Sequence, residues 1–258
     1  MANDVVLQGS HIGKWFGRRS ERRQVLFDVS VAVHAGECLA VIGGSGSGKS
    51  TLTRILLGLE TADAGTVTYQ GADVTCGSRA AGYQALRRDS GLVYQDPFAS
   101  LNPRWTVARS VGEPLHLRHR GMGSDDVARR CAEALDTVGL EPSTFLNRYP
   151  VDLSGGQAHR VAIARAIVNN PKVLLADEPM SAIDVAARVQ ILEAFAAIRR
   201  RTPDMALIVV SHDLGVVQHL ADRIVVLHDG RVVEEGPTAR ILREPRNAYT
   251  RTLVVAAS

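Results

Sequence analysis

The stretch CLAVIGGSGSGKST, residues 38–51, decides the fold. It begins with five apolar residues in a row, which is typical of a strand covered on both faces of a sheet. The run leads into the pattern Gly43-x-x-x-x-Gly48-Lys49-Ser50, and a helical pattern of apolar residues follows it. A strand, a glycine-rich turn and a helix in this order are the context in which such a turn binds phosphate.

The turn also has the residue types that phosphate binding requires. Glycines let successive backbone N–H groups point toward one place at a helix N-terminus, where they form an anion-binding nest. Lys49 would reach the β- and γ-phosphates of a nucleotide, and the Ser50 hydroxyl would bind Mg²⁺. The residues of this predicted phosphate loop are Gly43, Gly44, Ser45, Gly46, Ser47, Gly48, Lys49, Ser50 and Thr51.

Two adjacent acids offer the carboxylates that a metal-dependent nucleotide site needs. The run VLLADEP ends a predicted strand with Asp177 and Glu178 side by side. Neighbouring residues at the end of a strand point in different directions, so the two can take different roles. We expect Asp177 to hold Mg²⁺ indirectly, by binding the ligands that coordinate the ion. Glu178 is expected to act as the general base for an attacking water.

Two more polar side chains follow apolar strands. Gln95 closes the run GLVYQ, and His212 closes MALIVVSH. Open α/β sheets bind ligands at the carboxyl ends of their strands, so both side chains are expected to face the γ-phosphate and the water. Either residue alone would more simply be structural, and the phosphate loop together with the acid pair favours a catalytic role.

A second glycine turn, LSGGQ at residues 153–157, precedes another apolar helix. A serine hydroxyl and exposed helix N–H groups make an anion site there by the same physics. No lysine or arginine lies between Pro150 and Ala158, so this turn suits a site whose cations come from elsewhere. The economical arrangement is a twofold dimer in which the second glycine turn covers the nucleotide on the partner's phosphate loop. The residues expected to do so are Ser154, Gly155, Gly156 and Gln157.

The rest of the chain alternates strand and helix patterns, except in its middle. Residues 25–33 alternate apolar and other side chains, which predicts a half-buried strand. After Asp152, strand and helix patterns follow one another up to a hairpin that turns at Asp229-Gly230, and the run VAARVQILEAFAAIRRR at residues 185–201 is expected to be one of these helices. This order predicts an α/β fold with a largely parallel sheet. Between residues 96 and 152 the strand signal is weak, so that segment is interpreted as a helical insertion. Its clearest helix is expected to begin with Ser124 as N-cap and to stop at Gly139, with Val127, Cys131, Leu135 and Val138 on one face.

Composition excludes several classes of protein. The 258 residues include 30 basic and 27 acidic side chains, a net charge of +3, which is too balanced to indicate a nucleic-acid partner. No apolar stretch is long enough to cross a bilayer, and the first residues lack the pattern of a signal peptide. The three cysteines are widely spaced, which predicts reduced thiols rather than a metal centre. We expect a cytoplasmic chain that reaches a membrane only through a partner.

The motifs GGSGSGKST, YQDP, LSGGQ, LLADEP, SAID and VSHD occur in the order and spacing of ATP-binding-cassette (ABC) ATPase domains. The chain resembles that family over almost its whole length. The resemblance implies an α/β fold: a P-loop NTPase (RecA-like) core with an N-terminal antiparallel β subdomain and an inserted α-helical subdomain. It places the core with its β subdomain at residues 1–95 and 160–235, the helical subdomain at 96–159 and a C-terminal tail at 236–258.

The resemblance also implies roles for single residues. ATP and Mg²⁺ are the implied cofactors, with Ser50, Gln95 and Asp177 near the metal. Glu178, His212 and Gln95 are the implied catalytic residues. Trp15 or Phe16 corresponds to the aromatic residue that stacks on adenine, and Phe16 is the preferred of the two. The residues of the implied dimer interface are Ser181, Ala182 and Asp184.

The segments VYQDPFASLNPRWTV and ILREPRNAYTRTLV resemble the oligopeptide, dipeptide and nickel importer branch, in its shorter type without a cysteine-bearing C-terminal extension. This implies a peripheral subunit on the cytoplasmic face of the cell membrane that energises uptake of short peptides or nickel chelates. Its implied partners are two permeases, a second ATPase (itself or a paralogue) and, through the permeases, an extracytoplasmic solute-binding protein. Phe98, Leu101 and Trp105 are expected to form the floor of a permease groove, with Asn102 and Arg104 at its rim.

Two other hypotheses stay open at this point. A soluble ABC ATPase of a phosphonate-cleavage complex would share the length and the tail of this chain. A non-hydrolysing regulatory module is disfavoured, because Glu178 and His212 are both present. The chain also departs from the usual family pattern, although no departure removes a group expected to touch phosphate. The departing residues are Ala158, His159, Met180 and Ile183.

Overall fold

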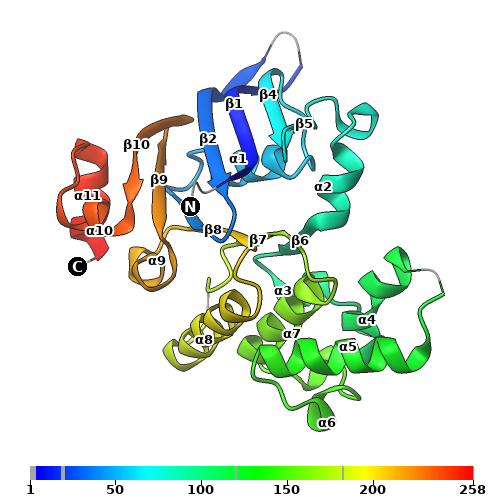
Figure 1. Ribbon diagram of the computed structural model, residues 1–258. Helices are drawn as coiled ribbons and strands as arrows, with labels where there is room; N and C mark the ends of the chain where they lie inside the picture. Colours follow the sequence, from blue (N-terminus) through cyan, green and yellow to red (C-terminus); the bar gives the residue numbers. More distant parts are fainter. Residues whose placement is uncertain (1–3, 19–20, 120, 182, 258) are drawn as a thin grey trace. The chain divides into compact units, whose positions relative to one another are not determined.

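The computed structural model of the chain describes residues 4–18, 21–119, 121–181 and 183–257 (Figure 1). The chain forms two compact units, Met1–Ser90 with Ala206–Ser258 and Gly91–Met205. These two units are defined by packing. The division into a core, a helical subdomain and a C-terminal tail, which the family resemblance implies, has different boundaries and stays a prediction. Among the described helices, none combines the length and the apolar character that a membrane span requires.

The first unit contains a four-stranded antiparallel sheet in the order β2-β1-β4-β5. Its strands are β1 (Val5–Phe16), β2 (Arg23–His34), β4 (Ala64–Tyr69) and β5 (Ala72–Asp73). The alternation predicted for residues 25–33 holds only from Val29 onward. Asp28 has a left-handed backbone (φ +56°). On the N-terminal side of Asp28, Leu26 is buried, whereas Val25 and Phe27, which the alternation predicted to be buried, are only partly so. The strand is therefore kinked where the sequence predicted a regular one.

The same unit contains the buried strands that lead to the phosphate loop. β3 (Cys38–Ile42) lies between β8 (Ala206–Ser211) and β9 (Arg223–His228) and is parallel to both. Every residue of β3 is buried, which explains its uninterrupted apolar sequence. β9 turns at the Asp-Gly pair 229–230 into the antiparallel strand β10 (Arg231–Pro237), which confirms the predicted hairpin.

The helices of the first unit are short. They are α1 (Lys49–Leu56), α2 (Tyr83–Asp89), α9 (Leu214–Leu220), α10 (Thr238–Arg243) and α11 (Ala248–Ala257), with a 3₁₀ turn η1 (Gly77–Arg79). One buried cluster joins Ile42 of β3 and Val226 of β9 to Val217 of α9 and Ile241 of α10. Tyr249 and Leu253 of α11 pack against the same cluster. The C-terminal segment is thus part of the core beside the strand that ends at the phosphate loop.

The second unit is mainly helical. Its strands are β6 (Ser90–Val93) and β7 (Val173–Asp177). Its helices are α3 (Pro97–Ser100), α4 (Val107–Arg118), α5 (Ser124–Thr137), α6 (Pro142–Phe145), α7 (Gly155–Ile167) and α8 (Val185–Arg201), with a 3₁₀ turn η2 (Pro150–Asp152). α7 is central, because α3, α4, α5 and α8 all contact it. Its long apolar sequence is therefore buried on several sides.

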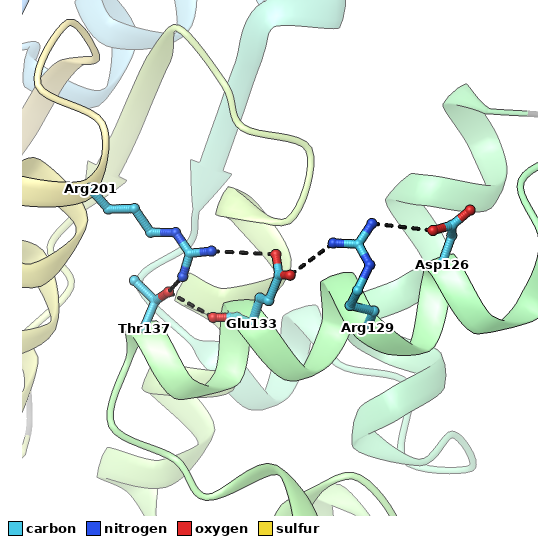
Figure 2. Close-up of polar contacts among 5 residues, drawn as sticks. All are labelled: Asp126, Arg129, Glu133, Thr137 and Arg201. Carbon is cyan, nitrogen blue, oxygen red and sulfur yellow. Dashed lines mark hydrogen bonds and ion pairs between the residues drawn. The ribbon is translucent and has the colours of Figure 1, made fainter.

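The helix predicted from Ser124 is confirmed as α5, although its N-cap is Gly123 rather than Ser124. Figure 2 shows how the exposed face of α5 is joined to α8. Arg129 bonds Asp126 at 3.2 Å and Glu133 at 2.8 Å, and Glu133 meets Arg201 of α8 at 3.3 Å. These side chains are about half exposed, so solvent screens each pair and its contribution to stability is small.

Candidate functional site

The phosphate loop leaves β3 and enters α1 in the first unit, as predicted. Gly43 has φ +154°, and a Cβ there would lie 2.1 Å from the carbonyl oxygen of Leu227. Only glycine fits at this position, because a real side chain would collide with the backbone of β9. The loop is therefore held tightly against the strand beside it.

Lys49 folds back over the loop. Its Nζ donates hydrogen bonds to the carbonyl oxygens of Gly43 (2.9 Å) and Gly44 (2.8 Å), and the residue is only 7% exposed. The ammonium charge is thereby fixed at the N-terminus of α1, where Gly48 is the N-cap and provides no side-chain cap. Charge and helix dipole both favour an anion here.

The Ser47 hydroxyl gives a direct test of whether a ligand fits the loop. Its Oγ is buried and has no hydrogen-bond partner among the described residues. Leaving a buried hydroxyl unpaired costs about 1–3 kcal/mol, which a phosphate oxygen in the loop would recover. The residues present thus fit a bound nucleotide.

His212 lies at the same edge of the sheet as the phosphate loop. β3 and β8 are paired in parallel with Ile42 opposite Ser211, so Gly43 and His212 leave their strands side by side. Asp213 holds the turn after His212, because its carboxylate accepts from the backbone of Gly215 at 2.9 Å. His212 itself is exposed.

In the second unit the structure brings together three residues from separate motifs. Gln95 donates from Nε2 to Glu178 Oε2 at 3.2 Å, and the same nitrogen lies 3.5 Å from Ser181 Oγ. Asp177 is the last residue of β7 and is half-buried. Glu178 follows it with a left-handed backbone, φ +47°, which is uncommon for a residue other than glycine. The backbone of Glu178 therefore turns sharply away from the strand that Asp177 ends.

The second glycine turn caps its own helix. Ser154 Oγ accepts from the Gln157 N–H at 3.3 Å, and Gln157 Oε1 accepts from the Ser154 N–H at 3.0 Å, which is a capping box. Ser154 and Gly155 are exposed. A Cβ on Gly156 would lie 2.6 Å from the Cβ of Ala187, so this glycine permits α7 and α8 to approach closely.

His159 was identified in the sequence only as a departure from the family pattern. It is 3% exposed, with Nδ1 at 3.1 Å from the Gly155 oxygen and Nε2 at 3.3 Å from the Gln95 oxygen. The ring therefore links the start of α7 to the segment that carries Gln95. A neutral imidazole can donate to only one of these two oxygens. No local pattern predicted this contact, because its two sides are 64 residues apart.

The remaining predicted site residues are placed as follows. Asp184 caps α8 by accepting from the Ala187 N–H at 2.8 Å, and Ala182 lies outside the described residues. Phe16 is 42% exposed, whereas Trp15 is half-buried, so Phe16 is the more accessible of the two rings. Lys14 Nζ lies 5.1 Å from the centre of the Phe16 ring.

A groove of about 420 Å³ lies over the segment between α3 and α4. Its lining includes Leu101, Asn102 and Trp105 but neither Phe98 nor Arg104. Of the three residues expected to form the apolar floor, Leu101, which is 3% exposed, and Trp105 line this groove, whereas Phe98, 45% exposed on α3, does not, and the permease contact itself stays a prediction. The charged residues of the lining are Glu113 and Arg165.

The chain is similar to known proteins in both sequence and structure. The sequence model of a family described as "ABC transporter" matches residues 26–181. The chain is 37% identical over 243 residues to the oligopeptide transport ATP-binding protein OppF of Salmonella typhimurium strain LT2, covering 94% of this chain and 72% of that protein. It is 38% identical over 242 residues to OppF of Lactococcus lactis subsp. lactis, covering 94% and 75%.

A further relative is the glutathione import ATP-binding protein GsiA of Salmonella choleraesuis, at 41% identity over 241 residues, covering 93% of this chain and 38% of that protein. Two solved structures are similar at 32% identity, covering 90% of this chain and 98% of theirs. One is a dimeric bacterial ABC transporter cassette, with a TM-score of 0.80. The other is a dimeric ATP-binding cassette in a post-hydrolysis state bound to ADP and Pi, with a TM-score of 0.79.

Proposed function

Since the chain belongs to the ABC transporter family of ATP-binding ATPase domains, we propose that it energises the import of short peptides from the cytoplasmic face of a membrane. The relatives named for oligopeptide transport and glutathione import support a peptide cargo. They are ATP-binding proteins of transport systems, so a soluble phosphonate-cleavage ATPase is not favoured. The nickel chelate that the sequence left open has no support among these relatives.

The phosphate loop is proposed to bind ATP. Lys49 and the N-terminus of α1 hold the phosphates, and Ser47 provides a buried hydroxyl that lacks a described partner. Ser50, Gln95 and Asp177 offer hydroxyl, amide and carboxylate oxygens, the hard ligands that suit Mg²⁺. When bound, Mg²⁺ supplies charge neutralisation on the phosphate oxygens. Phe16 offers an exposed ring to the adenine base.

Hydrolysis is assigned to Glu178 as the general base that takes the proton of the attacking water. The Gln95 amide donates to one oxygen of this carboxylate at 3.2 Å, which fixes the direction in which the carboxylate faces. His212 is proposed to contact the γ-phosphate from the edge of the sheet where the phosphate loop also begins. In this scheme Glu178 takes the proton, Gln95 orients the Glu178 carboxylate and His212 binds the γ-phosphate.

The second glycine turn is proposed to cover the nucleotide of a second ATPase subunit. Ser154 and Gly155 are exposed at the start of α7, where the helix dipole favours an anion. The two similar solved cassettes are dimers, which supports this arrangement. Ser181 and Asp184 would lie in the interface, and the second subunit is either another copy of this chain or a paralogue.

The groove between α3 and α4 is the observation that carries the transport part of the proposal. A buried leucine, a half-buried tryptophan and two opposite charges in about 420 Å³ suit one helix of a membrane partner. ATP chemistry needs none of these residues. The groove is therefore proposed as the permease contact, with Phe98 exposed beside it.

Purification from membranes tests this proposal. The chain, affinity-tagged and isolated from gently solubilised membranes, should bring down two multi-spanning permeases and a second ATPase subunit. Trp105→Ala should reduce that recovery, whereas Leu117→Ala, a change at a 73% exposed side chain of α4 that does not line the groove, should not. Recovery of soluble partners alone would contradict the importer and restore the phosphonate-complex hypothesis.

A further inference from the structure

Tyr249, in the first turn of α11, contacts the phosphate loop directly. The backbone N–H of Gly44 donates to Tyr249 Oη at 2.7 Å, across 205 residues of sequence. The tyrosine ring stacks on His228 at the end of β9, with ring centres 3.7 Å apart and an angle of 18° between the planes. ATP binding as proposed above gives no role to either aromatic residue.

The tail that carries Tyr249 is fixed by a buried carboxylate. Glu234 of β10, 9% exposed, accepts from the backbone N–H groups of Arg246 (3.0 Å) and Asn247 (2.9 Å). Arg240 donates to the same carboxylate at 2.9 Å. The Asn247 side chain in turn accepts from the Tyr249 N–H at 2.8 Å. Tyr249 therefore reaches the loop from a rigid support.

The tyrosine contacts a peptide group that also contacts the cation of the loop, because the Gly44 N–H and the Gly43 carbonyl, which accepts from Lys49 Nζ, belong to the same peptide. The carbonyl oxygen of Gly44 accepts from Lys49 Nζ, while the N–H of the same residue donates to Tyr249. Gly44 has no side chain that could hold its backbone in place. The tyrosine hydroxyl thus fixes the residue against which Lys49 is placed.

We propose that Tyr249 is a positioning residue of the nucleotide site, through which the C-terminal tail sets the geometry of Gly44 and Lys49. The inference rests on ATP binding by the phosphate loop. It makes α11 part of the ATP site, so tail and nucleotide are coupled. Because such coupling is reciprocal, bound nucleotide must also stabilise the tail.

Tyr249→Phe removes the hydroxyl and keeps the ring on His228. In the full chain, the Kd for ADP with Mg²⁺ should rise about 3- to 10-fold, the loss expected for one hydrogen bond. The KM for ATP should rise by a similar factor with kcat nearly unchanged, as expected when binding is weakened equally in ground and transition states. Tyr83→Phe is the matched control, since its hydroxyl accepts from Arg87 on α2, away from the loop. That control should leave Kd and KM unchanged.

Hydrogen exchange separates positioning from a structural role. Saturating ADP should slow amide exchange in residues 248–257 of the wild-type chain, and Tyr249→Phe should abolish this effect while its melting temperature stays close to that of Tyr83→Phe. Wild-type affinity in Tyr249→Phe, or exchange in α11 that ignores ADP in the wild type, would overturn the inference. A wild-type chain that binds no ADP would overturn the nucleotide site itself, which is a distinguishable result.

Glu234→Gln provides a second variant that leaves Tyr249 intact. It weakens the support of the tail, so the KM for ATP should rise in the same direction. An unchanged KM in Glu234→Gln together with a raised KM in Tyr249→Phe would confine the effect to the hydroxyl and contradict a role for the tail.

Discussion

At the scale of single residues, Glu178 shows how backbone geometry separates two neighbouring acids. Asp177 ends β7, and Glu178 adopts φ +47° as the chain turns back, with the Ser181 N–H donating to the Glu178 carbonyl at 3.1 Å. A left-handed backbone costs a residue other than glycine about 1 kcal/mol or more, so surrounding structure must hold it. The sequence predicted that the two acids differ in role but gave no sign of this conformation.

Glu178→Gln should leave ATP affinity unchanged and lower kcat by about 10²–10⁴-fold, because the amide keeps the shape of the side chain but cannot accept the proton of water. Steady-state hydrolysis and nucleotide titration of the assembled complex measure both quantities. Glu21→Gln, an exposed acid in the first unit, is the control and should hydrolyse normally. Full turnover by Glu178→Gln would assign the base to another residue, with His212 the next candidate.

Gly43 and Gly46 should respond differently to the same change. A Cβ at Gly43 would meet the Leu227 oxygen at 2.1 Å, whereas a Cβ at Gly46 would meet no atom within 4 Å. Gly43→Ala should therefore lower the free energy of unfolding by about 2 kcal/mol or more, and Gly46→Ala only by the roughly 1 kcal/mol of its left-handed backbone. Denaturant unfolding without nucleotide measures both. Equal losses would show that the loop is not packed against β9.

At the scale of elements, the sequence predicted those helices and strands whose apolar residues recur at a regular local spacing. β3 and α8 were expected from five continuous apolar residues and from a long helical run, and both occur at those residues. Burial of Val127, Cys131 and Leu135 likewise follows from helical spacing in α5. α2 was not expected, because its short sequence YQALRRD buries only Leu86 and gives little periodic signal.

Contacts between distant segments lay outside any local pattern. The links of His159 to the Gln95 backbone and of Tyr249 to Gly44 join residues 64 and 205 positions apart. The chemistry of each side chain was visible in the sequence, but its partner was set by the packing of α7 and α11. Motif spacing could therefore locate the candidate site while missing the residues that position it.

The anchor of the tail predicts a pH dependence. Burial alone would raise the pKa of Glu234, but hydrogen bonds from the backbones of Arg246 and Asn247 and from Arg240 outweigh it and lower the pKa to about 2. Since the folded pKa lies below the ordinary value of 4.5, the carboxylate stabilises the fold fully above pH 4.5 and loses this contribution as pH falls toward 2. The full contribution is on the order of 3 kcal/mol.

Urea unfolding at several pH values checks this, because Glu234→Gln should remove that part of the stability lost between pH 4.5 and pH 3. Glu235→Gln, at a more exposed neighbour paired with Arg223, should retain the wild-type slope. A Glu234→Gln profile parallel to the wild type would contradict the assignment.

At the scale of the whole molecule, the two glycine turns are proposed to make one site only when two ATPase subunits meet. Gly155 offers a clean test, because a Cβ there meets no atom within 4 Å and an acid in the first turn of a helix is favourable. Gly155→Glu should thus fold normally and repel the phosphates of the partner's nucleotide. Ser154→Arg would be less clean, since it also removes the cap of α7, worth about 1 kcal/mol.

In the Glu178→Gln background, ATP should double the mass of the isolated chain from 27.8 kDa, and added Gly155→Glu should hold it at 27.8 kDa with ATP affinity unchanged. Light scattering after gel filtration gives the mass. A chain that stays monomeric in both forms would assign the second subunit to a paralogue. Loss of ATP affinity in Gly155→Glu would contradict a turn that acts on the partner's nucleotide.

ATP-dependent uptake of a labelled short peptide into vesicles is the most direct test of the importer, using the chain reconstituted with its permeases and binding protein. The wild-type complex should accumulate peptide, and the loaded binding protein should stimulate hydrolysis. Phe98→Asp should lose both effects while the isolated subunit still hydrolyses ATP, and Leu117→Asp, at a still more exposed apolar side chain on α4, should keep them. Peptide uptake that is unaffected by Glu178→Gln, or hydrolysis that no loaded binding protein stimulates, would contradict a chain that energises peptide import.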